Sequence, residues 1–129
     1  MQGLTRTFWL LLLLFAVSGC STSQASANDK WVGHTETGQA SYYADRYLAR
    51  PTASGELYQA GENTAAHRTL PFGSMVRVTN LKNGKSVVVR INDRGPFVRG
   101  RIIDLSRAAF ESIGRASEGL LRVEIEVIR

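Results

Sequence analysis

The chain has 129 residues, enough for one small domain. It carries 16 Lys and Arg against 11 Asp and Glu, an excess that suits a polyanionic partner (cell-wall glycan, membrane surface or nucleic acid) without choosing among them. Cys20 is the only cysteine, which excludes an intramolecular disulfide and a Cys₂ or Cys₄ metal site. With only His34 and His67 as imidazoles, we also expect no structural zinc.

The first 20 residues have the pattern of a secretory signal. Arg6 precedes an apolar run from Phe8 to Val17, which is followed by Ser18-Gly19-Cys20. The run is shorter than the ~20 residues that a membrane-spanning helix needs. Its end resembles a bacterial lipobox, which predicts a signal peptide over residues 1–19 and a lipidated Cys20. The alternative is an ordinary signal with an incidental cysteine.

Residues 20–37 are predicted to be the lipidated cysteine and a flexible tether, and residues 38–129 the folded domain. The tether prediction rests on the stretch STSQASAN from Ser21 to Asn28, which is small, polar and without apolar periodicity. His34 has no neighbours that resemble a ligand set, so we expect a surface histidine.

The first half of the domain contains short elements between loops. Gln39–Tyr43 predicts a first strand, in which adjacent Tyr42 and Tyr43 point to opposite faces, one inward and one toward a cleft. Pro51 and Gly55 mark Arg50–Glu56 as a loop. A single helical turn is expected around Thr64–Ala66, with His67 at its end.

A hairpin is the clearest local signal. Val76–Asn80 and Ser86–Ile91 are rich in β-branched residues and flank Asn83-Gly84. The second strand runs into the segment Asn92–Phe97, which we expect to leave the sheet because Gly95 and Pro96 break the ladder. Polar groups at a strand end are typical of a site held on a loop.

The C-terminal third predicts a strand, a helix and a strand. Arg101–Leu105 is a brief apolar strand, and Ser106 is an N-cap for a helix over Arg107–Ile113 that stops at Gly114. Asp104 is expected either to bind amides near the helix N-terminus or to be catalytic. Leu121–Ile128 alternates as a half-buried strand. Five or six strands and one clear helix favour a compact, mainly-β barrel.

Several blocks occur together and in order: GQASYY from Gly38, TASGE from Thr52, TAAH from Thr64, NDRGPF from Asn92 and IDLS from Ile103. They resemble the rare lipoprotein A (RlpA) family of septal lytic transglycosylases. The resemblance implies a small six-stranded double-psi β-barrel with one or two short helices. It also implies cleavage of the β-1,4 bond between N-acetylmuramic acid and N-acetylglucosamine in peptide-stripped strands, with formation of a 1,6-anhydro end. The family has Trp-Tyr and then glycine where this chain has Tyr42-Tyr43-Ala44.

The family's essential residues correspond here to Glu56, His67 and Asp93. Protonation of a glycosidic oxygen requires an acid, and we assign that role to Asp93. Glu56 is the second candidate acid or a stabiliser of the sugar cation, and His67 orients a carboxyl or binds substrate. Arg94 is expected to point toward substrate or solvent.

Further substrate contacts are predicted from three side chains. Tyr43 is expected to bind a sugar, and Arg94 and Arg68 are candidates to hold the lactyl carboxylate of muramic acid. No phosphate-binding glycine loop follows a strand, so nothing supports nucleotide binding. We also expect no cofactor and no nucleic-acid partner. A hydrolase with a catalytic triad of Ser54, His67 and Asp93 is a further alternative, but no nucleophile-elbow signature accompanies Ser54.

Two other functions stay open at this point. One is a glycan-binding or wall-loosening lipoprotein that resembles the expansins and does not cleave. The other is a glycoside hydrolase with two carboxylates, which would leave a reducing end. In each case the expected partners are glycan strands, a membrane through the anchor at Cys20 and septal proteins of the divisome.

The expected location is the cell envelope of a Gram-negative bacterium. Ser21 after the lipidated cysteine is typical of proteins at the inner leaflet of the outer membrane, facing the periplasm. We expect a monomer, and no SPOR domain after Arg129.

Overall fold

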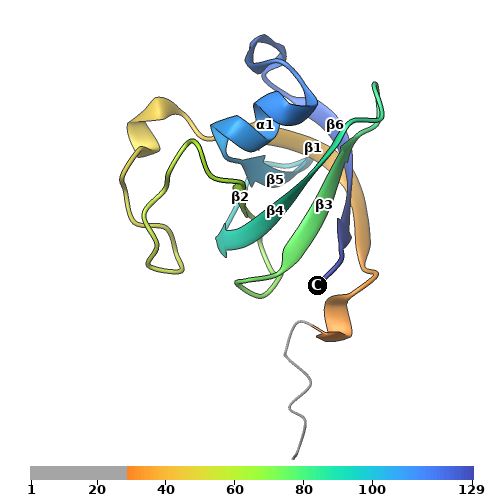
Figure 1. Cartoon of the computed structure of the whole chain (residues 1–129), viewed down its shortest axis with the longest axis horizontal. Coiled ribbons are helices and arrows are strands. Elements are labelled where there is room, and N and C mark those ends of the chain that lie inside the picture. Colours follow the sequence, from red (N-terminus) through yellow and green to blue (C-terminus); the bar gives the residue numbers. More distant parts are fainter. Residues whose placement is uncertain (1–28) are drawn as a thin grey trace, which may run out of the picture.

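The computed structural model describes residues 29–129. Six strands and one α-helix follow one another in the chain, with one short 3₁₀ turn before them and two between them (Figure 1). The elements are η1 (Asp29–Trp31), β1 (Thr35–Tyr42), η2 (Asp45–Tyr47), β2 (Thr64–Ala66), β3 (Met75–Asn80), β4 (Ser86–Asp93), β5 (Arg101–Leu105), α1 (Arg107–Ile113), η3 (Ala116–Glu118) and β6 (Leu121–Val127). The predicted signal peptide, Cys20 and the STSQASAN stretch lie outside the described residues.

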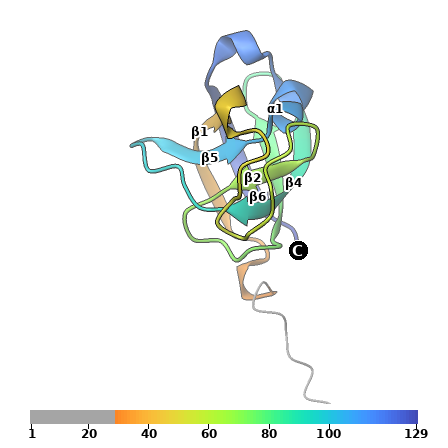
Figure 2. The same cartoon turned by 90° about the vertical axis from the view of Figure 1, so that its left-hand side faces the viewer.

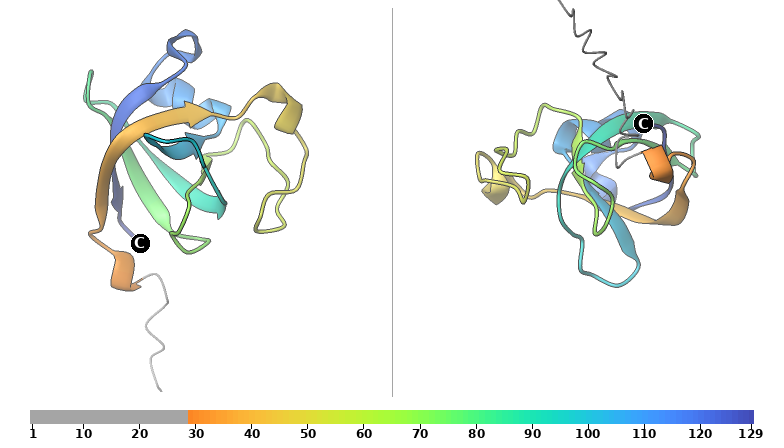
Figure 3. Two further views of the ribbon diagram at one scale, coloured as in Figure 1. Left: turned by 180° about the vertical axis from the view of Figure 1, so that it is seen from behind. Right: turned by 90° about the horizontal axis from the view of Figure 1, so that it is seen from below.

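The six strands close into a barrel in the order β1-β5-β2-β4-β3-β6. Two neighbouring pairs are parallel, β1 with β5 and β2 with β4, and the other four are antiparallel. Closure leaves no free sheet edge. Helix α1 packs beside the barrel, and two long connections, residues 43–63 and 94–100, project from it (Figures 2 and 3). The prediction of a six-stranded barrel with an inserted helix is confirmed.

The barrel interior is filled by branched aliphatic side chains. Alternate residues of β3, β4 and β6 point inward, because side chains on a strand alternate between its two faces. Phe110 and Ile113 of α1 are fully buried with them. The largest fully buried side chains from the strands are Ile91, Ile103, Leu105, Ile125, Val76, Val78, Val89, Val123 and Val127.

The hairpin and the helix support each other. Gly84 takes a φ of +74° in the turn between β3 and β4, a conformation that glycine adopts without strain. The side-chain amides of Asn80 and Asn83 both donate to the carbonyl of Ile113, at 2.8 and 2.9 Å. At the other end of α1, Ser106 Oγ accepts from the Ala109 amide. The predicted hairpin, the Ser106 cap and the helix Arg107–Ile113 are confirmed.

Three sequence predictions need correction. Thr64–Ala66 is a strand and not a helical turn, because it hydrogen bonds to β4 on one side and β5 on the other. The second hairpin strand runs on to Asp93, beyond Ile91. Strand β1 begins at Thr35, where it pairs with Glu126 of β6, so the barrel starts before the predicted boundary at residue 38. No helix within residues 29–129 is long and apolar enough to cross a membrane.

Candidate active site

A pocket of about 510 Å³ opens between the two projecting connections. Its walls come from the end of β1, the η2 segment, the residues that follow β4, and β5. The lining residues are Tyr42, Tyr43, Ala44, Arg46, Tyr47, Pro51, Asp93, Arg94, Gly95, Pro96, Phe97, Val98, Arg101 and Asp104. Aromatic rings, arginines and two carboxylates therefore share one cavity.

Asp93 is held in this wall by three hydrogen-bond donors. The amides of Ala53 and Arg94 donate to Oδ1 at 2.8 and 2.9 Å. The Tyr43 hydroxyl donates to Oδ2 at 2.6 Å. Because two rigid backbone donors hold Oδ1, the orientation of the carboxyl is fixed by three separate segments of the chain.

The local sequence explains how the Asp93 side chain reaches the pocket. Its carbonyl still accepts from the amide of His67, which extends the pairing of β2 and β4 to the last residue of β4. Gly95 then takes a φ of +119°, which turns the chain out of the sheet. The side chain is thus placed by a strand and presented at the start of a loop, as the sequence predicted.

Tyr43 connects Asp93 to an aromatic cluster. Its ring lies 4.5 Å from that of Tyr58 and 5.9 Å from that of Tyr47, measured between centroids. Burial, and then the hydrogen bond to Asp93, raise the pKa of Tyr43 well above its ordinary value. The hydroxyl therefore stays protonated and available as a donor. Tyr42 packs its edge on Phe110, so the predicted difference between the two tyrosines is observed, although both line the pocket.

The second carboxylate of the pocket is Asp104, on β5. Its Oδ1 accepts from the Ser41 hydroxyl and from Nη2 of Arg101, the latter at 2.5 Å. Ser106, and not Asp104, caps the N-terminus of helix α1. The prediction that Asp104 binds amides near the helix N-terminus is therefore wrong. Its place on a strand beside β1 was not visible in the sequence, because the pairing joins segments about 60 residues apart.

Glu56 lies outside the residues that line the pocket. One of its oxygens accepts from Arg90 Nη1 at 2.6 Å, and the other accepts from Asn92 Nδ2 at 3.2 Å. These contacts, Arg90 first, lower the pKa of Glu56. The same loop gives the Ala53 amide to Asp93. Glu56 therefore fixes the loop of residues 51–57 on β4 next to Asp93.

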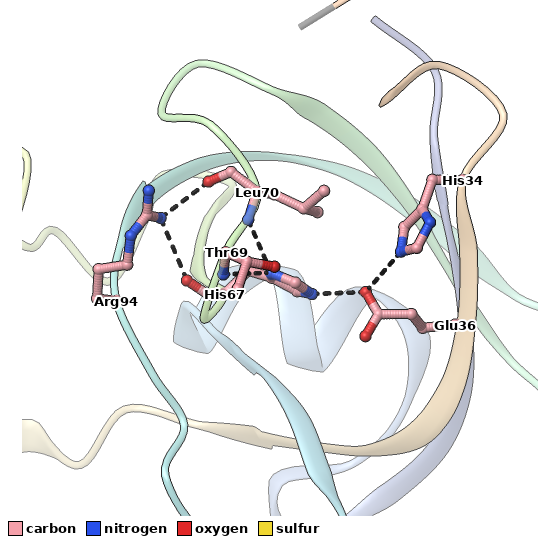
Figure 4. Close-up of polar contacts among 6 residues, drawn as sticks. All are labelled: His34, Glu36, His67, Thr69, Leu70 and Arg94. Atoms are coloured by element: carbon pink, nitrogen blue, oxygen red, sulfur yellow. Dashed lines mark hydrogen bonds and ion pairs between the residues drawn. The ribbon is translucent and has the colours of Figure 1, made fainter. Parts of the chain in front are cut away.

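The ring of His67 turns away from the pocket. Figure 4 shows Nε2 directed at Glu36 Oε2, 2.7 Å away, while Nδ1 accepts from the amides of Thr69 and Leu70 at 3.1 Å each. Since Nδ1 accepts two hydrogen bonds, the proton of the ring is on Nε2 and is donated to Glu36. The His67 side chain is 3% exposed. One predicted role of His67 was to orient a carboxyl. In the structure the carboxyl that it contacts is that of Glu36.

The two arginines predicted to hold substrate are placed differently. Arg94 lines the pocket, yet its Nη1 donates to the carbonyls of His67 and Leu70, and its guanidinium lies 4.0 Å from the ring centroid of Phe72. It therefore secures the loop after β2 (Figure 4) instead of pointing toward substrate or solvent. Arg68 is exposed and is not among the lining residues.

The structure thus groups Asp93, Tyr43 and Arg94 with Asp104, and leaves the side chains of Glu56, His67 and Arg68 outside the pocket. Among residues 29–129, no group of three or more His, Cys, Asp or Glu side chains is arranged to hold a metal ion. Glu36 was missed because it falls in the segment assigned to the tether. The flanking Thr35 and Thr37 were the available signal, since threonine is common in strands.

The barrel defines the class of protein. The Streptomyces papain inhibitor superposes with a TM-score of 0.62 at 26% identity, over 76% of this chain and 97% of that chain. An expansin from Clavibacter michiganensis superposes with a TM-score of 0.59 at 21% identity, over 74% of this chain and 50% of that chain. The fold is that of the double-psi, expansin-like β-barrels.

Sequence comparison then gives the family. A family model described as lytic transglycolase matches residues 35–125, and the chain belongs to that family. Proteins named endolytic peptidoglycan transglycosylase RlpA from Neisseria meningitidis and Vibrio cholerae are each 55% identical to it, over 94 and 96 residues. These matches cover 73% and 74% of this chain, but only 39% and 36% of the two relatives. The resemblance to RlpA is confirmed.

Proposed function

We propose that this chain is a lytic transglycosylase that cleaves the β-1,4 bond between N-acetylmuramic acid and N-acetylglucosamine in peptidoglycan strands. The observation that carries the proposal is the carboxyl of Asp93, held by three donors in the wall of a pocket large enough for sugar rings. Membership of the lytic transglycolase family and the names of the relatives support it. An expansin with the same fold, in complex with cellohexaose, supports a carbohydrate substrate.

One carboxyl is enough for this reaction. Protonated Asp93 gives its proton to the glycosidic oxygen while the bond from that oxygen to C1 of muramic acid breaks, and the bonding electrons leave with the oxygen. The C6 hydroxyl oxygen of the same muramic acid attacks C1 and forms the 1,6-anhydro ring. The hydroxyl proton returns to Asp93, so the acid is regenerated and no water is consumed.

Two neighbours assist Asp93. A tyrosine hydroxyl both donates and accepts, so Tyr43 keeps its contact with Oδ2 whether or not that oxygen carries the proton. The transition state places positive charge on the sugar ring. Asp104 lines the same pocket and binds Ser41 and Arg101 through Oδ1, so in this proposal its second oxygen, Oδ2, stabilises that charge.

Glu56 and His67 act on this site by positioning. Glu56 secures the loop that supplies the Ala53 amide. His67 folds the loop after β2 through Thr69 and Leu70, and carbonyls of that loop receive Arg94, the residue next to Asp93. Loss of the Glu56 or the His67 side chain would therefore displace the carboxyl of Asp93 without removing it.

The test uses the full chain, purified in detergent, with intact sacculi and with amidase-stripped glycan strands. Mass spectrometry of the products is expected to show anhydromuramyl ends with the native chain and none with Asp93→Asn. Reducing ends would assign a hydrolase with two carboxylates, for which Asp104 is the second one in the pocket. Binding to strands without cleavage would leave a wall-loosening or glycan-binding protein.

The relatives named as endolytic peptidoglycan transglycosylases support a location in the cell envelope, where peptidoglycan lies. We further propose that it is anchored at Cys20 in the inner leaflet of the outer membrane, with septal proteins of the divisome as partners. Fractionation of cells that express the native chain or Cys20→Ala tests the anchor: the variant is expected to leave the outer-membrane fraction. Equal distribution of the two would contradict the anchor.

A further inference from the structure

Three arginines line the pocket: Arg46, Arg94 and Arg101. Two of them already have acceptors within the domain. Arg94 donates to the carbonyls of His67 and Leu70, and Arg101 is paired with Asp104. These internal contacts orient both guanidinium groups, that of Arg94 through Nη1 and that of Arg101 through Nη2.

Arg46 is different. Its guanidinium contacts Tyr47: Nη2 donates to the Tyr47 hydroxyl at 3.2 Å, and the group lies 5.0 Å from the centroid of the Tyr47 ring. Within residues 29–129 it forms no ion pair.

The position of Arg46 relative to the acid follows from ring contacts. The Arg46 guanidinium contacts Tyr47. The Tyr47 ring packs edge-on against Tyr43, and the Tyr43 hydroxyl donates to Asp93. A chain of three contacts therefore connects Arg46 to the proposed acid, and all of the residues in this chain line the pocket. Tyr47 also offers an exposed ring of the kind that stacks on sugars.

We propose that Arg46 binds the free lactyl carboxylate of N-acetylmuramic acid and so makes the pocket select peptide-stripped strands. Muramic acid differs from glucosamine by this lactyl group, which ends in a carboxylate only after the stem peptide is removed, because the peptide converts it to an amide. A guanidinium binds a carboxylate through two parallel hydrogen bonds and binds a neutral amide more weakly. This replaces Arg94 and Arg68 in the role predicted for them, and it rests on the proposed function for the nature of the substrate.

The experiment compares stripped strands with the same strands whose lactyl carboxylates have been capped as methylamides. Arg46→Gln is the test variant, and Arg68→Gln is the control, since Arg68 is an exposed arginine outside the pocket. Both substitutions are made also in the Asp93→Asn background, where equilibrium binding to fluorescent strands is measured. Binding is thereby scored independently of cleavage.

Native chain and Arg68→Gln are expected to bind stripped strands about tenfold more tightly than capped strands, the size of one charge-assisted contact. Arg46→Gln is expected to bind stripped and capped strands equally. When Asp93 is native, the weaker binding of stripped strands should raise KM and leave kcat unchanged. An Arg46→Gln variant that still prefers stripped strands would overturn the proposal. Arg46→Gln could lose the binding selectivity as expected while even the chain with native Asp93 cleaves no strands. In that case the proposed catalysis fails and the assignment of Arg46 stands.

Discussion

The hydroxyl of Tyr43 lies 2.6 Å from Oδ2 of Asp93, which joins the end of β1 to the end of β4. These two strands are not neighbours in the barrel, since β5 and β2 lie between them. The contact therefore links the two strands through side chains and not through sheet pairing. It makes the position of the proposed acid dependent on an aromatic residue about 50 positions earlier in the chain.

Tyr43→Phe tests that dependence. The substitution keeps the ring that packs against Tyr58 and removes the donor to Asp93. We expect kcat to fall about tenfold, the rate equivalent of one hydrogen bond of about 1.4 kcal/mol, with KM little changed. Tyr42→Phe is the matched control, because its hydroxyl donates to the carbonyl of Ala116 instead. Equal losses of kcat in the two variants, measured by release of anhydromuramyl products, would contradict the role of Tyr43.

A double-mutant cycle separates positioning from catalysis at Glu56. If Glu56 acts through its 2.6 Å contact with Arg90, Glu56→Gln and Arg90→Met should each lower the rate several-fold, and the double variant should be no slower than Glu56→Gln. An acid role predicts instead a loss of about 100-fold or more for Glu56→Gln alone. Glu126→Gln is the control, since its pairing with Arg77 is exposed and remote from the pocket.

Glu36 should make stability depend on pH. The hydrogen bond from His67, above all, lowers the pKa of Glu36 in the folded chain. A carboxyl with a lowered folded pKa stabilises the fold above its unfolded value of about 4.3, and this contribution is lost as the pH falls through the lower folded value. Glu36→Gln should therefore be less stable than the native chain at pH 7, and the difference should shrink below about pH 4.

Thermal unfolding between pH 7 and pH 3, roughly the range over which such a carboxyl titrates, is the measurement. Glu111→Gln serves as the comparison, because its pairing with Arg107 is exposed on α1. A constant difference between Glu36→Gln and the native chain at every pH would show that the carboxylate of Glu36 does not contribute through its charge.

The helix cap offers a test of the fold that is independent of function. Ser106→Ala removes the acceptor for the Ala109 amide and should lower the free energy of unfolding by about 1 kcal/mol. Ser112→Ala, within the same helix, removes a hydroxyl that only donates to the Ala108 carbonyl. It should leave stability unchanged or slightly higher, since alanine has the best helix propensity. The measurement is urea denaturation. An equal loss in the free energy of unfolding for Ser106→Ala and Ser112→Ala would contradict the role of the cap.

Elements whose signals are local were predictable from the sequence. The hairpin around Gly84, the Ser106 cap and the alternation in β6 each lie within one short window, and all three are present in the structure. Strand β2 was not predictable in this way. It has three residues with two alanines, and its strand conformation is imposed by β4 and β5, which come later in the chain.

The candidate site shows the same division. A site on the segment that contains Asp93 was predicted because polar, turn-forming residues follow an apolar strand, and the choice of Asp93 within that segment came from the resemblance to the RlpA family. The contacts of Asp104 with Ser41, and of His67 with Glu36, join residues 63 and 31 positions apart. They depend on which strands become neighbours in the barrel, so no window of sequence contains them. Arg46 was overlooked because an arginine in a loop looks the same whether its charge is paired or not.

The two ends of the described chain meet beside β1 and β6. Gly33 donates to Val127 at 2.8 Å, and Val127 in turn donates to His34. Figure 1 shows η1 and the C-terminus at the same end of the barrel. Circular permutation is therefore compatible with this architecture: a short linker from Arg129 to Asp29, with new termini at the Asn83-Gly84 turn, would preserve every strand neighbour. Strand β6 contributes no residue to the pocket lining, so a load applied at the C-terminal end of the domain bears first on the pairing of β6 with β1 and β3, and not on the residues that would grip the glycan.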